Sequence, residues 1–208
     1  MLCSRLCHDL LSPVGAMTNG LELLADETDP QMRERCLELL GQSAKASADK
    51  LKFFRLAFGA AGGFGDRVPM EEPKAAIMAL VGEGKRIDVR WALAVDTLPK
   101  PAVKVLLNLA HIGLESLVRG GTLDIGAERT DGASEIVVRA AGPKIAFDPV
   151  IGEALQQELP TAELSGRTAP AWMVGALAEK LGGSVQFQRS DDALLLGAVI
   201  PEGEGMIG

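Results

Sequence analysis

The sequence predicts an α+β protein: an N-terminal helical hairpin followed by an α/β sandwich. Residues 1–62 hold two long segments with helical spacing of their apolar residues, and residues 66–208 alternate between helix-like and strand-like segments. The glycine-rich stretch FGAAGGFGDRVP, residues 58–69, lies where the two patterns meet. Because no lysine or serine follows its glycines as in a phosphate loop, we interpret it as a linker and expect domains over 1–62 and 66–208.

The first helix is predicted over most of residues 1–25. Its apolar residues recur at spacings of three and four, and they form one stripe along the helix: Leu6, Leu10, Val14, Met17, Leu21 and Leu24. A new helix should start at Asp29 and Pro30, because aspartate caps helices and proline favours their first position. The second helix extends to about Ala60, antiparallel to the first.

The rest of the chain predicts helices on one face of a mostly antiparallel sheet. Helices are expected over 71–84, 100–118, 148–159 and 168–183. Strands are expected over 88–95, 122–129, 135–142, 184–190 and 193–200. Short turns join the second strand to the third and the fourth to the fifth, which makes two β-hairpins.

Composition excludes several classes of protein. The chain of 208 residues has 21 basic and 28 acidic residues and a formal net charge of −7, so nucleic acid and anionic membranes would not attract it. No apolar run approaches the ~20 residues that span a bilayer. Three cysteines and a start unlike a signal peptide fit a reducing compartment, and we expect a cytoplasmic protein.

One histidine is placed to meet a partner. At ~100° per residue, His8 lies roughly 165° from the centre of the apolar stripe and so points outward. Asp9 could accept its Nδ1 proton or orient the ring. The same face is mostly small or polar, which would let another protein approach, and the expected docking residues there are Ser4, Arg5, Ser12, Gly15 and Asn19. Pro13 joins this set because it should bend the helix and expose the ring further.

An exposed histidine without a metal cluster or a serine partner suits nucleophilic capture of a phosphoryl group. This transfer needs positioning and charge neutralisation, and an incoming partner can supply magnesium and an acidic cluster. We therefore expect His8 as the nucleophile, Asp9 as its helper, and no cofactor bound by this chain.

Two other features have structural interpretations. Cys3 and Cys7 lie one helical turn apart, but His8 points elsewhere and no fourth ligand is near, so we expect small buried thiols and no metal site. His111 lies in a strongly apolar helix, where we expect a packed structural histidine.

The segment HDLLSP, residues 8–13, resembles the His-[Glu/Asp]-x-x-[Ser/Thr]-Pro phosphoacceptor motif of histidine-kinase dimerisation domains. As in those domains, it lies on the first of two hairpin helices. The resemblance implies that two chains pair their hairpins into a dimeric four-helix bundle. The order of elements in residues 66–208 is similar to that of the ATP-binding domain of the same kinases.

The nucleotide motifs of that kinase domain are altered in this chain. Asn108 matches the first asparagine of the magnesium site, but Ile112 stands where the metal-binding asparagine should be. Ala140 replaces the adenine-binding aspartate, and only Gly142 of that turn matches. The lid glycines are replaced, and the proline there removes a backbone donor; the substituted positions are Thr168, Ala169, Pro170 and Ala171. The resemblance implies a retained phosphoacceptor and no nucleotide site.

This combination resembles the ChpT-type histidine phosphotransferases of alphaproteobacteria, which are dimers with a kinase-like shape and no kinase activity. The resemblance implies that His8 takes phosphate from the receiver domain of a hybrid histidine kinase. It implies onward transfer to response regulators of the CtrA and CpdR kind, in cell-cycle control. The partner receiver domain would supply the Mg²⁺.

Two alternative functions stay open. A divergent ATP-dependent histidine kinase could bind a nucleotide with Asn108 and an unusual lid, and it would autophosphorylate with ATP. A non-catalytic adaptor that binds and blocks receivers would keep its effect after replacement of His8 by alanine.

Overall fold

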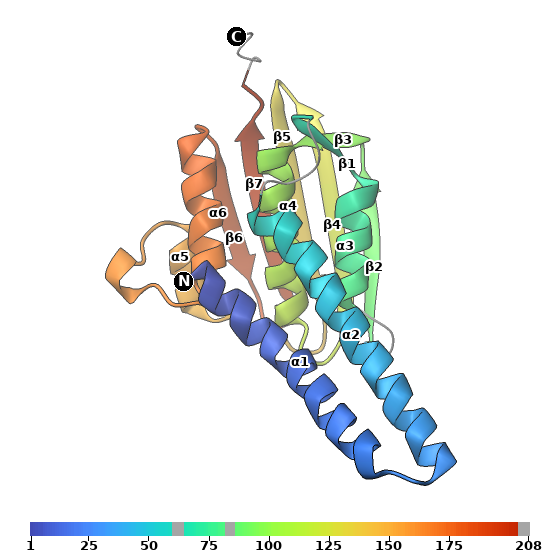
Figure 1. Cartoon of the computed structure of the whole chain (residues 1–208). Coiled ribbons are helices and arrows are strands. Elements are labelled where there is room, and N and C mark those ends of the chain that lie inside the picture. The colour runs from blue at the N-terminus through green and yellow to red at the C-terminus, as the bar shows by residue number, and fades with distance from the viewer. Residues whose placement is uncertain (60–64, 82–85, 204–208) are drawn as a thin grey trace.

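The computed structural model describes residues 1–59, 65–81 and 86–203. It consists of a helical hairpin and a layer of helices on a sheet, which confirms the predicted fold class (Figure 1). The predicted domain boundary, residues 63–65, lies outside the described residues except for Gly65. Within the described ranges, no helix combines the length and apolarity needed to cross a membrane.

The hairpin is formed by α1, Leu2–Asp26, and α2, Pro30–Phe58, which run antiparallel (Figure 1). Asp29 caps α2 as predicted: its carboxylate accepts a hydrogen bond of 3.2 Å from the backbone N–H of Gln31. Pro30 occupies the first turn of the helix. The tip of the hairpin projects beyond the sandwich, whereas the C-terminal end of α2 packs against the helices of the second half (Figure 1).

The sandwich is built on a five-stranded sheet with the order β2-β4-β5-β7-β6. β2 and β4 are parallel, and the other neighbouring pairs are antiparallel. The strands are β2 Ile87–Leu93, β4 Gly121–Thr130, β5 Ala133–Ala141, β6 Ser184–Arg189 and β7 Ala193–Pro201. Both predicted β-hairpins are confirmed, β4 with β5 and β6 with β7.

Helices α3, α4 and α6 cover one face of the sheet (Figure 1). The helices of the sandwich are α3 Glu71–Val81, α4 Lys100–Ser116, α5 Pro149–Leu155 and α6 Ala169–Lys180, with the 3₁₀ helix η1 Thr161–Glu163. α5 is shorter than predicted, because Gln157 adopts a left-handed φ of 62° just after it. Two strands of three residues were not predicted, β1 Arg67–Pro69 and β3 Thr97–Pro99, and they pair with each other.

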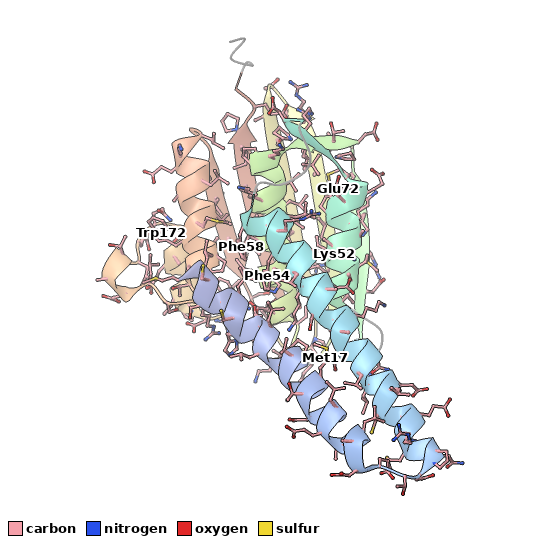
Figure 2. All side chains as sticks on the ribbon, viewed as in Figure 1. Met17, Lys52, Phe54, Phe58, Glu72 and Trp172 are labelled. Carbon is pink, nitrogen blue, oxygen red and sulfur yellow. The ribbon has the colours of Figure 1, made fainter. Side chains whose placement is uncertain are left out.

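One hydrophobic core joins the hairpin to the sandwich. Leu106 and Leu109 of α4 are fully buried at its centre, and Phe53 and Ala57 of α2 are fully buried in the same cluster. Figure 2 shows the adjacent residue Phe54, which is 4% exposed, where α2 crosses the sandwich. The two predicted domains are therefore packed together along the last turns of α2.

Candidate functional site

His8 lies in the first half of α1 with its imidazole in solvent. Its side chain is 84% exposed, in agreement with its angle from the apolar stripe. Nδ1 lies 3.2 Å from Oδ1 of Asp9. One ring nitrogen is therefore held by a neighbour, and Nε2 on the other side of the ring is open to an incoming group.

Asp9 is the neighbour that fixes the ring, and its own carboxylate is only 14% exposed. Its second oxygen, Oδ2, accepts a hydrogen bond of 2.7 Å from Nε of Arg5. Burial opposes ionisation of Asp9, but the hydrogen bonds from Arg5 and His8 and the positive charge of Arg5 outweigh it. Together these interactions lower the pKa of Asp9 below its ordinary value.

The ionised state of Asp9 decides the tautomer of His8. An ionised carboxylate can only accept hydrogen bonds, so Nδ1 of His8 carries the proton that it shares with Oδ1. In the neutral ring, Nε2 then keeps its lone pair. Asp9 therefore fixes the tautomer of the His8 ring in which Nε2 is the nucleophilic nitrogen, on the solvent side.

Arg5 does not lie on an open docking surface, which corrects its predicted place there. Its side chain is 13% exposed and lies between two carboxylates, Asp9 of the same helix and Glu115 of α4, where Nη2 donates to Oε1 of Glu115. Burial lowers the pKa of Arg5, but Glu115 and Asp9 outweigh this effect and raise it. Arg5 is thus a permanent cation that ties α1 to the sandwich.

Pro13 is likewise misplaced in the predicted docking set, because the fold buries it. It lies seven positions from Leu6, which is nearly two helical turns, so it faces the same apolar side of α1. A proline has no N–H to donate to the carbonyl oxygen four residues earlier. That oxygen, of Asp9, instead accepts a hydrogen bond of 2.7 Å from Nζ of Lys50 on α2.

The other predicted docking residues lie on the outer side of α1. Ser4, Ser12 and Asn19 are exposed, and Gly15 is half-buried. A Cβ added at Gly15 would meet no atom within 4 Å. The outer surface of α1 beside His8 is therefore accessible to a partner protein at these positions.

A cavity of about 380 Å³ adjoins His8 and contains residues that sequence analysis did not select. Its lining joins α1, the end of α4 and the loop before α6: Ser4, Arg5, His8, Glu115, Gly166 and Arg167. Arg167 pairs with Asp148 at 2.9 Å. No sequence pattern connects Glu115 or Arg167 to His8, because they lie more than 100 residues away in the chain.

The altered magnesium-site motif lies on α4, and its asparagine is directed toward α2. Asn108 is 1% exposed, and its Nδ2 donates to the carbonyl oxygens of Lys104 at 2.8 Å and Ala57 at 3.3 Å. Ile112, one turn later, is also buried. The ring of His111 lies 5.2 Å from that of Phe53, centroid to centroid, which agrees with its predicted packing role.

The cysteines differ from the prediction. Cys3 and Cys7 are exposed, whereas Cys36 is buried. The fold of the single chain therefore leaves the thiols of Cys3 and Cys7 uncovered. Among the described residues, no group of three His, Cys, Asp or Glu side chains is arranged to hold a metal ion.

Comparison with known proteins decides the family. The family model for the histidine phosphotransferase C-terminal domain matches residues 70–193, which is more than half of the chain. The chain belongs to the histidine phosphotransferase family. This confirms the resemblance that the phosphoacceptor motif and the altered nucleotide motifs predicted.

Two relatives of this histidine phosphotransferase match it over nearly its whole length. The protein phosphotransferase ChpT of Brucella abortus is 30% identical over 198 residues, which are 95% of this chain and 93% of the relative. The solved structure of a bacterial phosphotransferase superposes with a TM-score of 0.81 at 29% identity, over 95% of this chain and 93% of that one.

The fold is also shared with histidine kinases. The Acinetobacter baumannii histidine kinase AdeS aligns with a TM-score of 0.50 at 14% identity, over 95% of this chain and 98% of that one. At this identity the similarity shows the fold alone. The histidine phosphotransferase therefore has the kinase-like architecture that the order of its elements predicted.

Proposed function

We propose that this chain relays phosphoryl groups between receiver domains. His8 takes the group from the receiver domain of a hybrid histidine kinase and passes it to response regulators of the CtrA and CpdR kind, in cell-cycle control. The observation that carries the proposal is the solvent-exposed ring of His8, held at Nδ1 by the nearly buried carboxylate of Asp9. The similarity to a protein phosphotransferase supports the same activity.

The transfer is a substitution at phosphorus. Nε2 of His8 attacks the aspartyl phosphate of the docked receiver, a P–N bond forms, and the P–O bond to the aspartyl group breaks with its electron pair. The receiver is left with a carboxylate, and the ring keeps its Nδ1 proton and gains positive charge. Asp9 stabilises that charge, and the reverse reaction delivers the phosphoryl group to a second receiver. When bound in the receiver, Mg²⁺ supplies charge neutralisation at the phosphoryl oxygens.

The receiver docks on the outer side of α1. Ser4, Ser12 and Asn19 are short, exposed polar side chains, and Gly15 leaves open space beside them. Short side chains let the loops of a partner come within reach of Nε2, which in-line transfer requires. The cavity beside His8 adds a contact from the loop before α6 through Arg167.

The phosphoryl group comes from a receiver and not from ATP. Asn108, the retained asparagine of the kinase motif, is 1% exposed, so its Oδ1, the atom that could bind a metal, is buried inside the fold. The side chain of Ile112 offers no ligand atom to a metal, and Pro170 offers no backbone N–H to a phosphate. Ala140 has no carboxylate to recognise adenine.

The active form is a homodimer in the cytoplasm. Apolar side chains of the hairpin away from the docking side are more than half exposed in the single chain: Leu21, Leu37 and Leu39. A second hairpin would remove this apolar surface from water in a four-helix bundle, which stabilises by ~25 cal/mol per Å² of buried surface.

The free thiols of all three cysteines fit a reducing compartment. The net charge of −7 argues against nucleic acid and anionic membranes as partners.

One assay tests the proposal. The receiver domain of a hybrid kinase is phosphorylated by its own kinase with radiolabelled ATP, purified, and mixed with this chain. Label should move to the chain, and His8→Ala should abolish transfer while receiver binding persists.

The two alternative functions predict other results. Label taken directly from ATP by the purified chain would show a kinase. Unchanged inhibition of receivers by the His8→Ala variant, with no label on the wild-type chain, would show an adaptor.

A further inference from the structure

Four side chains form a continuous series from the sandwich to the phosphoacceptor. Glu115, near the end of α4, accepts a hydrogen bond from Nη2 of Arg5. Nε of the same guanidinium donates to Oδ2 of Asp9 at 2.7 Å, and Oδ1 of Asp9 lies 3.2 Å from Nδ1 of His8. The series spans 110 positions in the sequence and links the two halves of the molecule.

We propose that Glu115 is a positioning residue for the phosphoacceptor, acting on His8 through Arg5 and Asp9. The inference rests on the proposed function of His8 and extends it to a residue of the sandwich. The guanidinium is planar, and its N–H groups point in fixed directions. When Glu115 holds one edge of Arg5, the Nε–H is aimed at Asp9, and the plane of the Asp9 carboxylate is set.

The burial of the series supports this role. The side chains of Arg5 and Asp9 are 13% and 14% exposed, and that of Glu115 is 45% exposed. A buried guanidinium that lost one of its two carboxylates would turn toward water or toward the remaining one. Either movement would change the hydrogen bond that sets the tautomer of His8.

Charge supports the same conclusion. Asp9, Arg5 and Glu115 together carry a net charge of −1 beside a ring that gains positive charge as the P–N bond forms. Replacement of Glu115 by glutamine makes that sum zero. The negative sum favours the transition state over the resting ring, which is the requirement for a faster reaction.

The first test separates positioning from docking. Phosphoramidate, a small phosphoryl donor that needs no docking surface, and a phosphorylated receiver are each used to label His8, with His8→Ala as the blank. For Glu115→Gln we expect both rates to fall about tenfold, the low end of effects for groups that orient a reactive histidine. A matched control is Asp124→Asn, since Asp124 pairs with Arg139 at 3.2 Å on the sheet, with a similar exposure of 37%. The control rates should equal those of the wild-type chain.

The second test asks whether Glu115 acts through Asp9. In the Asp9→Asn background, Glu115→Gln should cause no further loss of rate, because the series is already broken. In ¹⁵N NMR spectra of the His8 ring, Glu115→Gln should shift the tautomer equilibrium away from the Nδ1–H form. A merely structural effect would leave that spectrum unchanged and would lower the rate by the same factor in both backgrounds.

The outcomes distinguish this inference from the proposed function. If the wild-type chain takes no label on His8 from the phosphorylated receiver, the proposed function fails, whatever phosphoramidate does. If the wild-type chain is labelled, and Glu115→Gln has the wild-type rate and tautomer, the relay function stands and the positioning role of Glu115 is wrong. A loss with the receiver only would assign Glu115 to docking and would also overturn the inference. Arg5→Lys gives a second variant, because an ammonium group cannot reproduce the two-directional contact, and it should show the same tautomer shift.

Discussion

At the scale of single residues, the ionised carboxylate of Asp9 orients the ring of the nucleophile His8. Replacement by alanine removes the acceptor for Nδ1–H of His8, so we expect phosphoryl transfer to slow by about tenfold to a hundredfold. Single-turnover labelling from a phosphorylated receiver measures this rate. Because the Asp9 carboxylate is nearly buried, binding of the receiver should change little, and a weakened complex with unchanged turnover would contradict the assignment.

The lowered pKa of Asp9 also gives stability a defined pH dependence. Since the folded-state pKa lies below the ordinary value of 3.8, ionised Asp9 stabilises the fold at any pH above that ordinary value. This contribution is lost as the pH falls through the folded-state pKa. The difference in unfolding free energy between the wild-type chain and Asp9→Asn should therefore shrink below about pH 4. Urea titrations at several pH values measure this difference. A difference that grows as the pH falls would contradict a lowered pKa of Asp9.

Gly15 tests the docking side of α1. An arginine there would extend into open space, since an added Cβ meets nothing within 4 Å, so the fold should be kept and the receiver excluded by bulk. We expect Gly15→Arg to weaken receiver binding at least tenfold and to leave labelling by phosphoramidate unchanged. Gly41→Arg is the control, because Gly41 on α2 is equally unobstructed. Equal binding by the two variants would move the docking surface elsewhere.

At the scale of elements, periodicity predicted those segments that are long enough to show it. α1, α2, α4 and both β-hairpins were predicted because their apolar residues repeat over many positions. β1 and β3 have three residues each, which is too short for a period. The early end of α5 was not predicted, because Gln157 adopts a conformation that usually calls for glycine and is held by a hydrogen bond to Trp172, a tertiary contact.

The exposed side of the hairpin predicts a dimer. Leu21 is 59% exposed in the single chain and belongs to the predicted apolar stripe. A glutamate at this position would place charge in the core of a four-helix bundle, where it is unpaired, so Leu21→Glu should give monomers. Light scattering after gel filtration measures the mass. Met78→Glu is the control and should stay dimeric, since Met78 is 49% exposed on α3, outside the hairpin. A monomeric wild-type chain would contradict the prediction.

At the scale of the whole molecule, the candidate site could be predicted only in part. His8 and Asp9 are adjacent, and their motif lies within six residues, so the sequence displays them together. Arg5 and Pro13 were assigned to the right helix but to the wrong surroundings, because their contacts come from α4 and from the apolar side of the hairpin. Glu115 reaches His8 only through the packing of α1 on the sandwich, which no local pattern encodes.

That packing depends on the end of α2, and Phe53 tests it. Its side chain is fully buried, with its ring centroid 5.8 Å from that of Phe54 and 5.2 Å from that of His111. Phe53→Ala should lower the free energy of unfolding by about 3–5 kcal/mol, because it removes buried apolar surface and leaves a cavity. Lys52→Ala is the control, since Lys52 is 71% exposed, and its effect should stay within about 0.5 kcal/mol.

Because this core is shared, the structured end of α2 should unfold together with the sandwich in one transition. Urea titrations followed by helical circular dichroism and by tryptophan fluorescence measure this at one fixed chain concentration, since a dimer makes stability depend on concentration. Trp91 and Trp172 both lie in the sandwich, so fluorescence reports that half and circular dichroism includes the hairpin. Coincident midpoints that shift together in Phe53→Ala are expected. If Phe53→Ala shifted the circular dichroism midpoint and left the fluorescence midpoint unchanged, the hairpin would unfold independently of the sandwich. The shared core would then not be what keeps Glu115 in contact with α1.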